Sequence, residues 1–125
     1  MGIKVGNVKQ TKAGSALYTT TVAKRLFILP PNAMIIGAKA NGVASNAATT
    51  GVLTLTSRPI DSSTKTTLAT MDVKTATAGV DAVAVLPVAG IAFARQAKAV
   101  EIEVTYTETG AAATAGAWTV LVDYL

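Results

Sequence analysis

Hydrophobic and polar residues alternate along several short stretches of the chain, a pattern typical of β-strands with one buried face. The clearest stretch is 99–107, where Val, Ile and Tyr at even positions alternate with Glu and Thr at odd positions. This alternation predicts an antiparallel strand whose even-numbered side chains lie in the core and whose odd-numbered ones face water.

Similar but shorter patterns recur along the rest of the chain, and they are separated by turn residues such as Pro30-Pro31-Asn32, Asn41-Gly42 and Arg58-Pro59. They predict strands at 16–22, 24–29, 34–40, 52–57, 67–74, 82–86 and 118–125, and a less regular one at 91–94. No segment of about 12 residues has helical periodicity. We therefore expect an all-β, antiparallel β-sandwich of eight or nine short strands. Several connections are too long for tight hairpins, which favours a jelly roll.

The start of the chain has two interpretations. Ile3, Val5 and Val8 alternate weakly with lysines and polar residues. Residues 1–15 are therefore either an extra edge strand or an arm that pairs with the sheet of a neighbouring molecule. Residues 16–125 are expected to form a single β-sandwich domain.

The composition points to contacts with other protein chains. Half of the residues are hydrophobic and only 14% are charged, against about 25% in typical soluble proteins. Such a chain has little charge to cover a large exposed surface, so we expect much of its surface to meet protein.

Charge is also unevenly distributed within the net charge of +4. The chain before Asp61 contains seven basic residues and no acidic one. From Asp61 to the end it contains four basic and seven acidic residues. This asymmetry suits head-to-tail contacts between copies, or the docking of a basic arm on an acidic partner. The candidate interface residues are Lys4, Lys9, Lys12, Lys24, Arg25, Arg58, Arg95, Glu101 and Glu103. Nucleic-acid binding is disfavoured, because the basic residues are scattered and are not interleaved with aromatic ones.

Several kinds of chemistry are excluded by the residues themselves. The chain has no Cys and no His, so it lacks thiolate sites and the commonest general base and metal ligand. Its first residues lack the apolar stretch of a signal peptide, and no run approaches the roughly 18 apolar residues of a membrane span. We expect synthesis in the cytoplasm and no membrane contact.

The remaining candidates for catalysis or metal binding are weak. Glu101 and Glu103 are about 7 Å apart on one strand face, a spacing that a glycosidase could use, but that face is expected to be in water or at an interface. Asp61, Asp72 and Asp81 lie outside any calcium-loop pattern. We predict a protein that is not an enzyme and that needs no cofactor and no metal.

Aromatic residues offer one further alternative, a carbohydrate-binding module. Trp118 and Tyr124 share one face of the strand at 118–125 with Val120 and Val122, which predicts that they belong to the core. A sugar-binding platform would instead need Tyr18, Tyr106, Trp118 and Tyr124 exposed in a row.

Three segments resemble small structural proteins of tailed bacteriophages, of the capsid decoration or cement type. The first, RLFILPPNAMIIG at 25–37, is an apolar strand, a Pro-rich turn and a second apolar strand. The second, SNAATTGVLTL at 45–55, is an Asn-Ala-Thr loop that leads into a strand. The third, from Val104 through Tyr124, resembles the closing hairpin of that family.

This resemblance covers most of residues 24–125 and carries no functional residues, since the shared motif is architectural. It implies a jelly roll that is present in many copies on a virion. The partners it implies are the major capsid protein and other copies of the chain, as a dimer or trimer, on the outer capsid surface. Members of the family also occur on necks, tails and head fibres, so a neck, tail or head-fibre component is the alternative to a capsid decoration protein.

Overall fold

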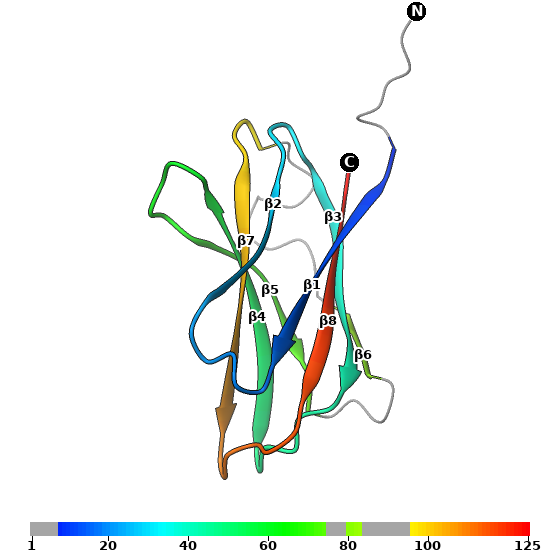
Figure 1. Cartoon of the computed structure of the whole chain (residues 1–125), viewed down its shortest axis with the longest axis vertical. Helices are drawn as coiled ribbons and strands as arrows, with labels where there is room; N and C mark the ends of the chain where they lie inside the picture. Colours follow the sequence, from blue (N-terminus) through cyan, green and yellow to red (C-terminus); the bar gives the residue numbers. More distant parts are fainter. Residues whose placement is uncertain (1–7, 75–79, 84–95) are drawn as a thin grey trace, which may run out of the picture.

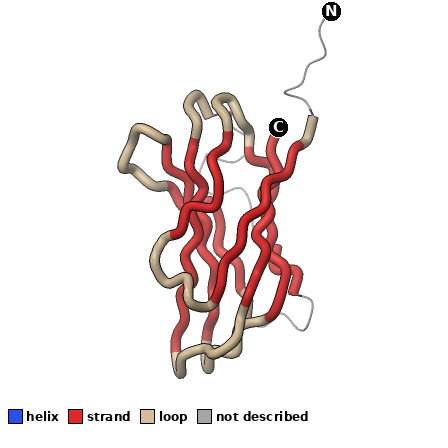
Figure 2. Tube along the Cα trace, viewed as in Figure 1, coloured by secondary structure: helices blue, strands red, loops and turns tan. Residues whose placement is uncertain are grey.

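The computed structural model describes residues 8–74, 80–83 and 96–125, and within them the chain forms β-strands joined by turns and loops (Figure 2). The strands are β1 (Gln10–Leu17), β2 (Lys24–Leu29), β3 (Ile35–Val43), β4 (Thr50–Pro59), β5 (Thr66–Asp72), β6 (Val80–Val83), β7 (Val100–Thr109) and β8 (Ala117–Tyr124). The prediction of an all-β fold with eight or nine short strands is confirmed.

The strands form two four-stranded sheets that face one another (Figure 1). The orders are β1-β8-β3-β6 and β2-β7-β4-β5, and every pair of neighbours is antiparallel. The chain changes sheet at every connection between consecutive strands except β4 to β5, which form a hairpin. This order of strands is a jelly roll, as the connection lengths suggested.

The core lies between the inner faces of the two sheets. The even-numbered residues predicted to be buried in β7 and β8 are buried, including Val104 and Val120, neither of which has any exposed surface. The rings of Tyr106 and Trp118 stack across the core with their centroids 5.5 Å apart, so β7 of one sheet touches β8 of the other. Burial of each large apolar side chain contributes about 1.5–3 kcal/mol.

The strand predicted at 16–22 is wrong, because β1 ends at Leu17 and a turn follows. The amide of Thr20 donates to the carbonyl of Leu17 over 2.9 Å, and the amide of Leu17 donates to the hydroxyl of Thr20. Residues 10–17 instead pair along their whole length with β8. β1 therefore lies at the edge of its sheet and crosses the boundary between residues 15 and 16 that separates the two predicted parts of the chain.

Two further expectations about turns are also wrong. Asn41-Gly42 does not close a turn: β3 runs on to Val43, since β3 and β4 lie in different sheets and cannot share a tight hairpin. The closing hairpin is absent for the same reason, because β7 and β8 lie in different sheets.

Gly42 has a conformation that a larger residue cannot adopt. Its φ is 152°, and a Cβ at this position would lie 2.0 Å from the carbonyl oxygen of Ala117 on the paired strand β8. Gly37, on the same strand, has room, because its nearest contact would be Asp123 Oδ2 at 3.7 Å.

We expect Gly42→Ala to lower the free energy of unfolding by about 2 kcal/mol or more, through backbone strain and the clash with Ala117. Gly37→Ala is the matched control and should change it by less than about 1 kcal/mol. Urea unfolding of both variants measures this difference. Equal stabilities would show that β3 does not pass this close to β8.

Candidate protein interface

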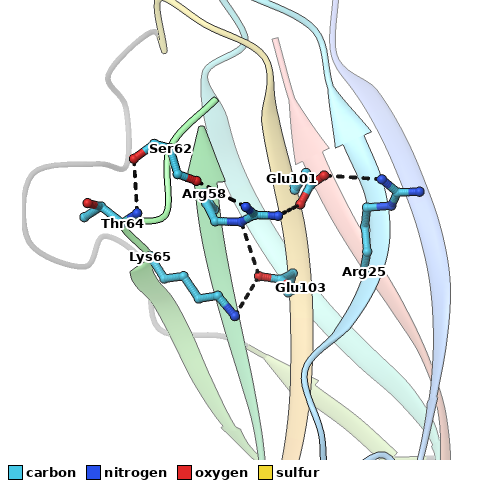
Figure 3. Close-up of polar contacts among 7 residues, drawn as sticks. All are labelled: Arg25, Arg58, Ser62, Thr64, Lys65, Glu101 and Glu103. Atoms are coloured by element: carbon cyan, nitrogen blue, oxygen red, sulfur yellow. Dashed lines mark hydrogen bonds and ion pairs between the residues drawn. The ribbon is translucent and has the colours of Figure 1, made fainter. Parts of the chain in front are cut away.

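Charged side chains from three strands and one loop meet on the outer face of β7 (Figure 3). Arg58 on β4 is the direct register partner of Glu101, and its Nη2 donates a hydrogen bond to Glu101 Oε2. Arg25 on β2 donates from Nη1 to the other oxygen of Glu101, Oε1, over 3.2 Å. Glu101 thus holds its strand to both neighbours at once.

Glu103 extends the same cluster toward β5. Its Oε1 lies 3.1 Å from Nζ of Lys65, in the loop before β5, and 4.0 Å from Nε of Arg58. The guanidinium of Arg58 also donates from Nη1 to the carbonyl of Ser62 over 3.2 Å, which ties the β4–β5 turn to the cluster. We call these five residues (Arg25, Arg58, Lys65, Glu101 and Glu103) the charge cluster.

The carboxylates of this cluster are not in water. Glu101 and Glu103 are each only 8% exposed, so the prediction of a wet outer face is wrong at these two positions. The physical reason is that the long stems of the basic side chains can lie over the strand while their charged ends neutralise the carboxylates. Three cations surround two carboxylates, which leaves a net charge of +1 (+3 − 2) on the cluster.

The pKa of Glu101 reflects these contacts. Burial opposes its ionisation, but hydrogen bonds from Arg25 and Arg58 and the charges of both guanidinium groups outweigh burial, so its pKa is lowered. Glu101 is therefore an ionised structural group at neutral pH. A glycosidase acid would need a raised pKa, so the acid/base hypothesis for the two glutamates finds no support in Glu101.

The lysines predicted to bind partners have different surroundings. Lys12 Nζ donates to the carbonyl of Ile28 and Lys24 Nζ to the carbonyl of Ser15, each over 2.9 Å. These bonds cross between β1 and β2 and join the edges of the two sheets, where lysines also discourage pairing with foreign strands. Lys9 is exposed.

Lys4 and Arg95, the remaining two candidate interface residues, lie outside the described residues.

Hydrogen bonds brace the loops at one end of the sandwich, which the sequence analysis did not foresee. Asn46 Oδ1, in the β3–β4 loop, accepts from the amides of Thr114 and Ala115 in the β7–β8 loop over 2.8 and 3.0 Å. Beneath them, the Tyr106 hydroxyl lies 2.5 Å from Ser45 Oγ and donates to Glu108 Oε2 over 3.0 Å. The low-complexity Ala/Thr/Gly loop is therefore held in a defined position.

Burial raises the pKa of Tyr106, and Glu108 raises it further, although the hydrogen bond with Ser45 acts in the opposite direction. Tyr106 therefore stays a neutral donor, and its contacts with Ser45 and Glu108 are structural. The only signal in the sequence was the polar Ser-Asn pair at the start of the loop, which is too common to identify a brace.

Aromatic residues do not form a sugar-binding platform. Tyr106, Trp118 and Tyr124 are 0%, 3% and 4% exposed, so three of the four candidates are in the core. A depression of about 330 Å³ lies over β1, β8 and β3. Its lining includes Ser15, Asn41, Thr119 and Trp118, but Trp118 is its one aromatic residue, so it offers no row of exposed rings.

The aspartates considered as metal ligands do not converge. Lys98 Nζ donates to Asp61 over 2.6 Å, and this bond lowers the pKa of Asp61. Asp72 accepts from the amide of Lys74 over 2.9 Å, and the side chain of Asp81 is not among those described. Within the described ranges, no three acidic residues gather as a metal site would require.

The part of the chain described by the structure contains no helix that is long and apolar enough to cross a membrane.

No protein-family model and no curated protein sequence matches the chain. Among the solved structures with a similar fold are three chains from phage capsids. One, in the cyanophage Pam1 capsid asymmetric unit, has a TM-score of 0.62 and 19% identity, over 99% of this chain and 89% of that one.

Two others have comparable scores. A chain in the capsid of Helicobacter pylori bacteriophage KHP30 has a TM-score of 0.61 and 12% identity, over 96% of this chain and 89% of that one. A chain in the capsid of Ralstonia phage GP4 has a TM-score of 0.60 and 15% identity, over 100% and 88%. At these identities the comparisons show a shared jelly-roll fold over nearly the whole length.

Replacement of Glu101 should reveal its lowered pKa as a pH dependence. A group with a lowered folded-state pKa stabilises the fold above its ordinary value, and that contribution is lost as the pH falls through the folded value. We expect Glu101→Gln to be less stable than the natural sequence at neutral pH. The difference should shrink as the pH falls below the ordinary glutamate value of 4.5. Chemical unfolding across the acidic range measures it.

Asp61→Asn is the control for this experiment, because the Asp61–Lys98 pair is exposed, with side-chain exposures of 56% and 62%. The loss of stability caused by Asp61→Asn should be smaller and should disappear in high salt, whereas the loss caused by Glu101→Gln should persist. A Glu101→Gln effect that does not change with pH would contradict the ionised, paired state of Glu101.

Proposed function

We propose that the chain is a non-enzymatic virion structural protein that binds the outside of a phage capsid as a decoration or cement protein. The observation that carries the proposal is the jelly roll it shares, over nearly its full length, with chains of three phage capsids. The low charge content supports it as well, because a surface with few charges suits extensive contact with other chains.

The physical demands of such a role match the fold. A cement protein bridges subunits of a shell through many modest contacts, and repetition over the lattice converts them into strong attachment. It needs a rigid scaffold more than a reactive centre. The charge cluster and the loop brace both supply rigidity, since each joins strands or loops that are far apart in the sequence.

Quantitative mass spectrometry of purified particles that carry the chain tests this proposal. We expect a copy number comparable to that of the shell subunits, and rebinding of the purified protein to shells from which it has been stripped. A copy number that is a small fraction of that of the shell subunits would contradict decoration and favour a neck, tail or head-fibre position.

We further propose that residues 1–7, which include Lys4, act as an arm that contacts a neighbouring subunit. β1 begins at Gln10 and Lys12 bonds to the carbonyl of Ile28, so the arm that can be removed without harm to the fold ends before β1.

We expect a protein without residues 1–7 to unfold with a free energy within about 0.5 kcal/mol of the full chain, and to bind stripped shells more weakly. Lys4→Glu is the matched variant, because it changes the charge and keeps the length. Sedimentation of the mixtures measures binding. If the shortened protein binds as well as the full chain, the arm has no role in attachment.

A further inference from the structure

Threonines predominate on the outer face of β7, β4 and β5 beyond the charge cluster. β-Branched or small polar residues point outward from three neighbouring strands, because the inward positions of these strands are taken by the core. We call this surface the threonine face: Thr50, Val52, Thr54 and Thr56 of β4, Thr105, Thr107 and Thr109 of β7, and Thr67, Thr70 and Asp72 of β5.

Side chains across this face are in register. Thr54 lies between Thr70 and Thr105, and the hydroxyls of Thr50 and Thr109 are 2.6 Å apart. Threonine has few rotamers, so little side-chain entropy is lost when such a face is covered. A flat, stiff and nearly uncharged face suits a protein partner better than a nucleic acid.

The size of the face is of the right order. Strands are about 4.8 Å apart and rise about 3.4 Å per residue, so the three strands of the threonine face, over about seven residues each, span a plan area of about 350 Å². A standard protein interface covers about 800 Å² of accessible surface on each partner. Loops at the margin of the sheet can supply the rest.

The charge cluster (Figure 3) adjoins one end of the threonine face, because Arg58 follows Thr56 along β4 and Glu101 and Glu103 precede Thr105 along β7. Its carboxylates are covered, but the side chains of Arg25 and Lys65 remain 59% and 44% exposed. The exposed charge at this end is therefore positive, and the cluster has a net charge of +1.

We propose that the threonine face is the surface through which this chain binds the shell. The partner is a flat shell-protein surface that is largely uncharged but carries one carboxylate opposite Arg25 and another opposite Lys65. This inference rests on the proposed function and assigns the face that performs it. The guanidinium of Arg25 can donate hydrogen bonds to a second carboxylate, because the side chain is more than half exposed and uses one nitrogen for Glu101.

The outer face of the other sheet is less suited to the same contact. Lys39 projects from the middle of that face, opposite Leu121, and has no ion-pair partner among the described residues. A covered interface would desolvate this charge, which no described side chain neutralises, at a cost. On the threonine face the cations lie at one end and already have partners.

Two threonines make a matched test of this assignment. Thr107 on the threonine face and Thr119 on the outer face of β8 are both exposed strand residues. We expect Thr107→Arg to weaken binding to stripped shells by about tenfold or more, and Thr119→Arg to leave binding unchanged. Thr107→Val, which keeps the β-branched shape, should bind normally, and circular dichroism verifies that each variant is folded.

The outcomes separate the two proposals. Normal binding by Thr107→Arg, or loss of binding by Thr119→Arg alone, would overturn the face assignment and leave shell binding in place. Failure of the natural protein to bind any shell would instead remove the proposed function.

Discussion

The structure depends on one constraint: β7 is buried on both faces from Val100 to Val104, and the outer face of this stretch carries two carboxylates. Glu101 and Glu103 can stay there only because the chain brings its own cations to them from β2, β4 and the loop before β5. Buried charges are tolerated when they are paired and hydrogen-bonded, and are costly otherwise. The same contacts fix β7 against its two neighbours, so the neutralisation of the carboxylates and the rigidity of the sheet have one cause.

That constraint also determines which surfaces are available to a partner. Glutamates that receive hydrogen bonds or ion pairs from Arg58 and Lys65 cannot serve as free contacts, and an ionised Glu101 is a poor general acid. What remains outward is the threonine face and the exposed ends of the basic side chains. A rigid sandwich with such a face fits binding to another protein, and the chain shares this fold with chains of phage capsids.

The sequence predicted the inner faces well, because alternation within one strand is a local property. The even-numbered residues of 99–107 and of 118–125 are buried as expected. The sheet to which each strand belongs is not a local property, so alternation could not predict it. Consecutive strands such as β7 and β8 lie in different sheets, and the expected closing hairpin does not form. The ion pairs that bury Glu101 could not be predicted from the sequence either, because Arg25 and Arg58 are 76 and 43 residues away from it along the chain.

A double-mutant cycle on Arg58 and Glu101 tests this account most directly. Arg58→Met and Glu101→Gln are made singly and together, and the free energy of unfolding of each protein is measured at neutral pH. If the pair holds β4 to β7, the double variant loses clearly less stability than the sum of the two single losses. Additive losses would mean that the carboxylate does not depend on this arginine, and the central constraint would be wrong.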